Sequence, residues 1–291
     1  MKRIVFLTVF AGIILAGCDR DPIDSELDHE VLIILSADPL SSSLLKSTAT
    51  TAENRVDKII LFGVDKQGTT ILEKYPAITN PTLAGFKLTI KKQVGTFYAI
   101  ANPSAALETA AAAASVSTVA QLKALTNNFG SAMPISPFLM AGEGAVNGAT
   151  ANIELIRAVA KIEIKAGAGF AISSVTVNNT PNSGFVFKQT TPSVPSSGVS
   201  RINYPVVNSA TPILYVAEST SSNPVTFDVS GRIENGNLTT YTVSLKVNSA
   251  NVNIARNTHY TVSIIPITET ECTVIVTIPN WADVNADPVN V

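Results

Sequence analysis

The sequence has few of the residues from which most catalytic and metal sites are built. Its 291 residues include only 2 His and 2 Cys, which leaves little for a metal site or a disulfide framework. Charged residues make up 14%, and 20 Lys and Arg nearly balance 22 Asp and Glu, which argues against a nucleic-acid-binding protein. Aromatic residues are sparse at 6%, which disfavours a surface for stacking sugars.

Apolar residues, in contrast, make up 46% of the chain, enough to bury a core and to argue against intrinsic disorder. The length fits one large or two ordinary domains, at about 100–200 residues per domain. Composition alone does not separate a catalyst from a structural protein.

The N-terminal segment has the pattern of a secretory signal. Two basic residues precede an apolar run over residues 4–14, and the run ends in Leu15-Ala16-Gly17-Cys18, which resembles a bacterial lipobox. We expect a signal peptide over residues 1–17, acyl chains such as palmitate on Cys18, and a solvated tether over residues 18–29. The alternative is an ordinary signal or a membrane anchor with a chance cysteine, although a spanning helix needs about 20 apolar residues.

From Glu30 onward, apolar residues mostly recur at every second position, the spacing of half-buried antiparallel strands. The pattern is clearest over residues 86–90, 225–233, 241–247, 260–264 and 274–278. Asn235-Gly236 between two of these runs is a turn signal. One helical segment is expected between Ala105 and Asn127, where an alanine run favours helix and Ser117 can cap a second stretch of helical turns.

Three glycines within residues 142–148 indicate a loop between domains. A division there predicts β-sandwich domains over residues 30–147 and 148–291. Residues 190–198 are rich in Ser, Thr and Pro but lie too far inside the second domain to divide it, so we interpret them as a long loop between strands.

Two of the expected strands have unusual patterns. In residues 154–165 every second residue is apolar, and Arg157 and Lys161 fall on the opposite face, which we predict to be solvated rather than catalytic. Val31–Leu35 are five apolar residues without alternation, so both faces of this strand should be covered inside a sheet. A terminal strand buried on both sides is one that could be exchanged.

No set of catalytic residues is visible, so we predict that the chain is not an enzyme and has no cofactor or metal. Cys272 shares the face of Val274 and Val276 and is expected to be a buried structural thiol. His259 is expected on an outer face and His29 in the tether, which gives no metal spacing or triad partner. Motifs of the common hydrolases and nucleotide-binding proteins are missing. Two carboxylates brought together by the fold, as in glycoside hydrolases, remain open.

Six short segments follow one another along the chain. They are Phe97–Asn102, Phe138–Gly142, Ile156–Ile162, Tyr215–Glu218, Arg256–Tyr260 and Val276–Trp281. In this order and behind a lipobox, they resemble the fimbrillins, lipoprotein-derived pilus subunits of Gram-negative anaerobic bacteria. The resemblance covers nearly the whole chain from about Arg55 to Trp281.

The resemblance implies a mainly β fold with two transthyretin-like antiparallel β-sandwich domains and a short helical insertion in the N-terminal one. It also implies that an extracellular Arg- or Lys-specific protease cuts after the first strand, and that a terminal strand of a neighbouring subunit fills the apolar groove. The matching exchangeable strand consists of Val31, Leu32, Ile33, Ile34 and Leu35. The cut matches Lys46, with Arg55 second because it abuts a strand and is expected to be less exposed. The candidate donor segment, Trp281–Val291, is short and rather polar.

These expectations together describe a structural subunit of a cell-surface fimbria that supports adhesion. We expect it first in the outer membrane as a lipoprotein and then in the fimbria. Its expected partners are other fimbrial subunits arranged head to tail, the membrane through the lipid, the processing protease and a host or bacterial surface ligand, with no nucleic acid. The alternatives are a monomeric surface lipoprotein that binds a glycan or host ligand, and a tip or anchor adhesin of the same pilus.

Overall fold

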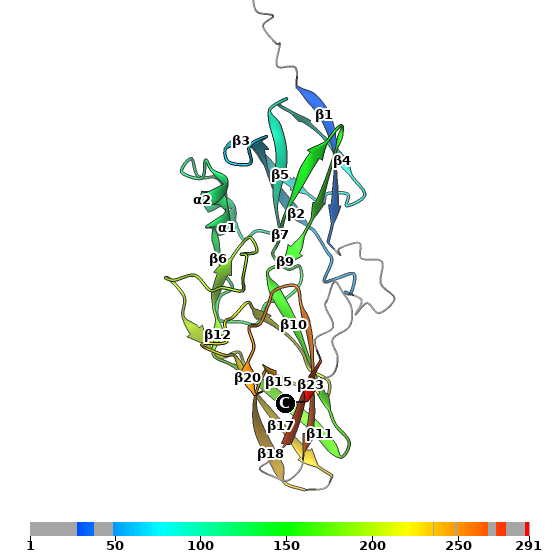
Figure 1. Ribbon diagram of the computed structural model, residues 1–291. Coiled ribbons are helices and arrows are strands. Elements are labelled where there is room, and N and C mark those ends of the chain that lie inside the picture. Colours follow the sequence, from blue (N-terminus) through cyan, green and yellow to red (C-terminus); the bar gives the residue numbers. More distant parts are fainter. Residues whose placement is uncertain are drawn as a thin grey trace, which may run out of the picture.

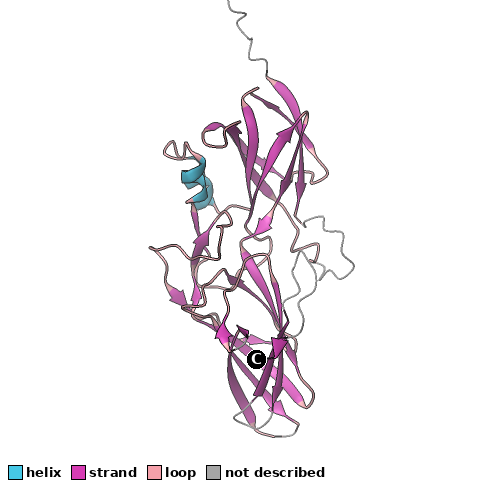
Figure 2. Ribbon diagram, in the orientation of Figure 1, coloured by secondary structure: helices cyan, strands magenta, loops and turns pink. Residues whose placement is uncertain are grey.

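The computed structural model describes residues 28–37, 49–234, 236–247, 249–266, 272–277 and 289–290. It is mainly β, as predicted, and its strands form two bodies arranged one above the other in Figure 1, with the helices at one side in Figure 2. No helix among these residues is long and apolar enough to cross a membrane. The first body contains the eight-stranded sheet, and the second contains the five-stranded and four-stranded sheets.

The sheet of the first body has the strand order β3-β2-β5-β7-β8-β1-β4, and β9 also pairs with β7. Its strands are β1 (His29–Ser36), β2 (Lys58–Asp65), β3 (Ile71–Thr79), β4 (Phe86–Ile90), β5 (Val94–Ala101), β7 (Met140–Asn147), β8 (Thr150–Glu154) and β9 (Ile156–Arg157). Most neighbours are antiparallel, but β1 and β8 run parallel. The expectation of purely antiparallel sheets is therefore wrong at this pair.

The core of the first body shows that this sheet folds over itself. The inward residues of β1 share one buried cluster with residues of β2 and β5, which lie several strands away in the sheet order. Val31 and Ile33 of β1 are fully buried there, together with Leu61 and Phe97. The two halves of the sheet thus act as the two layers of a sandwich.

The opposite face of β2 and β5 is covered by two short helices, α1 (Ala105–Ala112) and α2 (Val119–Lys123). Leu107 of α1 and Leu122 of α2 are the buried anchors. The predicted helical segment is confirmed, but the cap of α2 is Thr118 rather than Ser117. Thr118 accepts a hydrogen bond from the Gln121 N–H, and the Gln121 side chain reaches back to form a capping box.

Two of the glycines that suggested a loop between domains lie inside strand β7. A Cβ on Gly142 would lie 1.8 Å from the Glu154 carbonyl oxygen, and one on Gly144 would lie 2.1 Å from that of Asn152. These glycines allow β8 to pass close to β7. Gly148 lies in the turn of the β7–β8 hairpin, so the division proposed between residues 147 and 148 falls inside one sheet. The chain instead reaches the second body at β10, after β9.

The second body is a sandwich of a five-stranded sheet, β16-β10-β21-β22-β23, and a four-stranded sheet, β15-β11-β17-β18. Its strands are β10 (Val159–Ala166), β11 (Phe170–Asn178), β15 (Val207–Asn208), β16 (Ile213–Ala217), β17 (Thr226–Ile233), β18 (Leu238–Ser244), β21 (His259–Pro266), β22 (Cys272–Thr277) and β23 (Val289–Asn290). The expected hairpin around Asn235-Gly236 is confirmed by the pairing of β17 with β18. Strands β10 and β21 are a second parallel pair.

Three small two-stranded sheets complete the fold. They are β6 (Thr126–Asn128) with β13 (Ser183–Phe185), β12 (Thr180–Pro181) with β14 (Arg201–Ile202), and β19 (Lys246–Val247) with β20 (Ala250–Asn251). The pairing of β6 with β13 joins a segment that precedes β7 of the first body to a segment that follows β11 of the second body. Residues 190–198 form the expected loop, between β13 and β14.

Candidate functional site

Strand β1 is held on both sides by neighbouring strands. It pairs antiparallel with β4, where Val31 lies opposite Leu88, and parallel with β8, where Ile33 lies opposite Ala151. The prediction that Val31–Leu35 lie inside a sheet is confirmed. If β1 were removed, β4 and β8 would each lose their hydrogen-bonding partner along this edge.

The two faces of β1 are covered unequally, which the run of five apolar residues did not reveal. Val31, Ile33 and Leu35 are buried in the core, whereas the alternate residues Leu32 and Ile34 are half-buried. A loop approaches this outer face, because a Cβ on Gly85 would lie 2.9 Å from the Leu32 side chain. The inward face therefore provides most of the apolar contact.

Several predicted residues lie outside the described part of the chain. These are Cys18, Lys46 and most of the candidate donor segment Trp281–Val291. Residues 289–290 of that segment are described as β23, which pairs with β22 of the same chain at Ile275 and Val276. Lipidation and the first-choice cut thus remain predictions.

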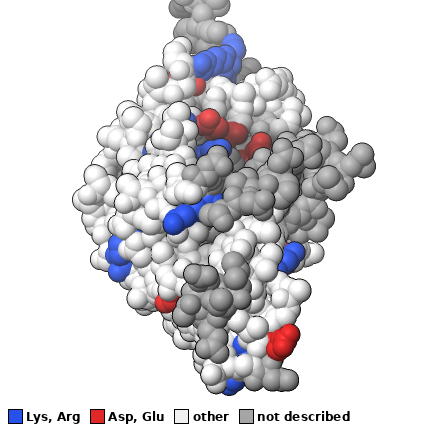
Figure 3. All heavy atoms as spheres, turned by 60° about the horizontal axis from the view of Figure 1, so that its bottom comes forward, with Lys and Arg blue, Asp and Glu red and all other residues white. Residues whose placement is uncertain are grey.

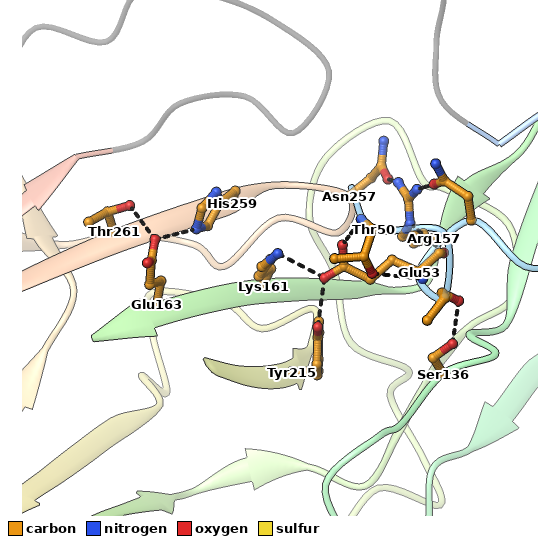
Figure 4. Close-up of polar contacts among 12 residues, drawn as sticks. Thr50, Glu53, Ser136, Arg157, Lys161, Glu163, Tyr215, Asn257, His259 and Thr261 are labelled. Carbon is orange, nitrogen blue, oxygen red and sulfur yellow. Dashed lines mark hydrogen bonds and ion pairs between the residues drawn. The ribbon is translucent and has the colours of Figure 1, made fainter. Parts of the chain in front are cut away.

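Residues 50–55, which we call the clasp, follow β1 in the described chain and lie between the two bodies (Figure 4). Glu53 is its central residue, with 2% of its surface exposed. Its carboxylate makes an ion pair of 2.9 Å with Lys161 of β10 and accepts a hydrogen bond of 2.6 Å from the hydroxyl of Tyr215 of β16. The Thr50 N–H donates to the other carboxylate oxygen at 2.6 Å.

Arg157, at the end of β9, holds the backbone of the clasp. It is fully buried, and its Nε donates to the Glu53 carbonyl at 3.1 Å. The two terminal nitrogens donate to the side-chain oxygens of Asn54 and Asn257, the latter at 2.8 Å. On the side of the first body, the Ser136 hydroxyl donates to the Ala52 carbonyl.

The prediction that Arg157 and Lys161 lie on a solvated face is wrong. Both side chains do point away from their aliphatic neighbours, but the clasp covers that face. Burial is tolerated because each cation has oxygen partners. The sequence did not reveal that another segment covers these two side chains. Both residues nevertheless fall within Ile156–Ile162, one of the segments that resemble the fimbrillins.

The placement predicted for His259 is also wrong. Only 6% of its surface is exposed, and its Nε2 lies 3.3 Å from the Glu163 carboxylate. Burial lowers the pKa of His259, and the nearby charge of Lys161 lowers it further, against the opposing effect of Glu163. His29 begins β1 instead of lying in a tether.

The carboxyl group of Glu53 is stabilised as an anion. Burial by itself raises its pKa, but the hydrogen bonds from Lys161, Tyr215 and the Thr50 N–H outweigh burial and hold the pKa below its ordinary value of 4.5. Burial and the Glu53 carboxylate raise the pKa of Tyr215 well above its usual range. At neutral pH the site therefore contains a buried anion paired with Lys161, and a second buried cation, Arg157, bonded to the backbone of the same residue.

Arg55, the second candidate for the protease cleavage site, is exposed, so the prediction of a less exposed residue at this position is wrong. Its side chain is 55% exposed and lies 2.9 Å from the Asp57 carboxylate. Its backbone is nevertheless held, since the Arg55 N–H donates to the Ala52 carbonyl at 3.3 Å and the Arg55 carbonyl accepts from Asn102 Nδ2 at 2.9 Å. Val56, which follows, is buried.

A second buried ion pair joins Arg256 and Glu218, with Nη2 at 3.1 Å from the carboxylate. Arg256 also donates to the carbonyls of Phe185 and Val186, at 2.7 and 2.9 Å. This pair fastens the segment after β13 to the second body. Both charged residues lie in segments that resemble the fimbrillins, but the resemblance did not predict that they form a buried ion pair.

No group of three or more His, Cys, Asp or Glu among the described residues is placed to hold a metal ion. Cys272 packs against the second core but is only half-buried, and burial raises the pKa of its thiol. On the face drawn in Figure 3, the Lys and Arg side chains are scattered among uncharged residues, and some of them lie beside Asp or Glu.

Comparison with solved structures identifies the fold. No protein-family model and no curated protein matches the chain. Among solved structures, a "putative cell adhesion protein" from Parabacteroides distasonis has a TM-score of 0.61 at 14% identity, covering 89% of this chain and 98% of its own. A protein with the same description from Bacteroides eggerthii has 0.59 at 16%, covering 87% and 96%.

A third similar structure is the tip fimbrial protein Mfa3 from Porphyromonas gingivalis, with C-terminal truncation. Its TM-score is 0.56 at 13% identity, and the match covers 87% of this chain and 100% of that one. The chain therefore has the fold of these proteins over nearly its whole length. The resemblance to the fimbrillins is confirmed at the level of the fold.

Proposed function

We propose that this chain is a structural, non-enzymatic subunit of a cell-surface fimbria that supports adhesion. The fold that it shares with cell-adhesion and fimbrial proteins supports this role. The observation that carries the assembly mechanism is the position of β1, a terminal strand paired on both sides with its inward face in the core. Its place can be taken by an equivalent strand of another subunit.

Strand exchange would use contacts of two kinds. Main-chain hydrogen bonds to β4 and β8 supply affinity, and the inward side chains at Val31, Ile33 and Leu35 supply register. Burying each of these side chains is worth about 1.5–3 kcal/mol, before the cost of ordering the incoming strand is subtracted. A head-to-tail contact of this kind does not close and therefore gives a filament.

Export and processing complete the proposal. The chain is exported as an outer-membrane lipoprotein through Cys18, and an extracellular Arg- or Lys-specific protease releases β1. Lys46 is the only Lys or Arg between β1 and the clasp, which supports it as the cut. Cys18→Ala should remove the acyl mass and move the protein out of the membrane fraction.

Digestion of the purified, tag-free protein with a lysine-specific endoprotease tests the processing step. We expect a fragment starting at Ser47, with release of β1 and growth of polymers or capture of an added strand peptide. Lys46→Gln is the matched control; it should not be cut at position 46 and should stay monomeric. A cut protein that stays monomeric at high concentration and captures no strand would instead support the alternative, a monomeric lipoprotein that binds a glycan or host ligand.

A further inference from the structure

The clasp connects the two bodies through both its backbone and its side chains. Glu53 contacts Lys161 and Tyr215 of the second body, while the Ala52 and Arg55 carbonyls accept from Ser136 and Asn102 of the first. Close by, the rings of Phe138 and Tyr215 pack with their centroids 4.6 Å apart. The clasp thus has polar contacts with both bodies, next to an aromatic contact that joins the two bodies directly.

Opening the clasp would break the ion pair of Lys161 with Glu53 and would remove two oxygen partners of Arg157, the Glu53 carbonyl and the Asn54 side chain. The Lys161 side chain is 8% exposed and Arg157 is fully buried. Breaking a buried ion pair by losing one partner is strongly unfavourable, because the remaining charge stays in a low-dielectric site. The closed clasp is therefore the strongly favoured state of the folded chain at neutral pH.

The clasp also contains the exposed basic residue Arg55. A protease binds its substrate as an extended segment, whereas here the Asn54 N–H donates to the Thr50 carbonyl at 3.1 Å and the Arg55 N–H to the Ala52 carbonyl. Cleavage after Arg55 would first require this turn to unfold and Val56 to leave the core. Exposure of the arginine side chain alone does not make the bond cleavable.

We propose that the clasp locks the two bodies together and protects the Arg55–Val56 bond, so that a protease trimming the N-terminal segment stops before Thr50. The clasp then stays in the mature subunit, where the junction resists bending. This proposal deepens the proposed function, because it determines which of two basic residues is processed. Protection of the bond can be measured whether or not the chain forms a fimbria.

Digestion of the full chain with an arginine-specific endoprotease, followed by intact mass, tests the protection. The wild-type Arg55–Val56 bond should resist cleavage, and Glu53→Gln should raise its cleavage rate at least about tenfold, because one buried partner is lost. Glu143→Gln is the matched control, because it removes the same charge from an exposed ion pair with Lys123. The Glu143 side chain is 52% exposed and that of Lys123 is 40% exposed, so this variant should leave the cleavage rate at Arg55–Val56 unchanged.

A second measurement separates clasp opening from general unfolding. In wild-type protein, hydrogen exchange at the Asn54 and Arg55 amides should be as slow as in β10, and Glu53→Gln should speed exchange in the clasp while β17 and β18 stay protected. The proposal is overturned if the wild-type bond is cut as fast as that of Glu53→Gln, or if the wild-type clasp amides exchange at unfolded rates. Failure to polymerise would bear on the proposed function alone.

Discussion

Truncation of Ile33 to alanine tests how β1 is held. Ile33 is fully buried in the first core, whereas Ile34, the next residue, is half-buried on the other face. Removing a buried isoleucine side chain loses its transfer free energy and leaves a cavity, so Ile33→Ala should lower the free energy of unfolding by about 2–5 kcal/mol. Ile34→Ala removes the same atoms from a half-buried site and should cost about 1 kcal/mol.

Urea unfolding of the full chain, followed by far-UV circular dichroism, measures both variants. Hydrogen exchange adds a local readout, because amides of β4 and β8 that pair with β1 should exchange faster in Ile33→Ala than in Ile34→Ala. Equal losses of stability for the two variants, or no loss for Ile33→Ala, would refute the reasoning that the inward face anchors this strand.

Three further predictions concern other parts of the fold. Gly142→Ala should lower the melting temperature by several degrees, because the new methyl group would meet a carbonyl of β8. Gly148→Asn should leave the melting temperature unchanged, because Gly148 lies in open space at a positive φ that Asn tolerates. Equal melting temperatures of the two variants would contradict this prediction. Burial, followed by the charge of Lys161, lowers the pKa of His259 below its ordinary value of 6.5, so the folded protein should lose stability as the pH drops below 6.5. Thermal melts across this pH range should show that His259→Gln weakens the pH dependence. Thr118→Ala should cost about 1 kcal/mol in urea unfolding through loss of the α2 cap, and an unchanged midpoint would show that the cap is dispensable.

Alternation of apolar residues was sufficient to predict most of the sheet structure. Phe227 and Val229 of β17 are buried and lie opposite Val243 and Tyr241 of β18, as period two requires. Alternation also placed Arg157 and Lys161 correctly on the face opposite the aliphatic residues. What covers that face could not be predicted, because Glu53 lies 104 residues before Arg157 in sequence.

Glycine was the other source of error. A cluster of glycines is typical of a loop, yet Gly142 and Gly144 are strand residues that allow β8 to approach. The distinction depends on which strand crosses at that point, and this is set by the tertiary fold. The parallel pairing of β1 with β8 was missed for the same reason, since strand direction is not encoded in the period of the apolar residues.

Exchange of β1 is the central claim, and capture of a labelled strand measures it most directly. The protein is cut with a lysine-specific endoprotease, depleted of the released segment, and mixed with a fluorescent peptide of residues 29–37 or with the same peptide carrying Ile33→Asp. We expect stable capture of the first peptide and at least about a tenfold weaker capture of the second, because a charge would enter the core. Equal capture of both peptides, or capture of neither, would contradict this expectation.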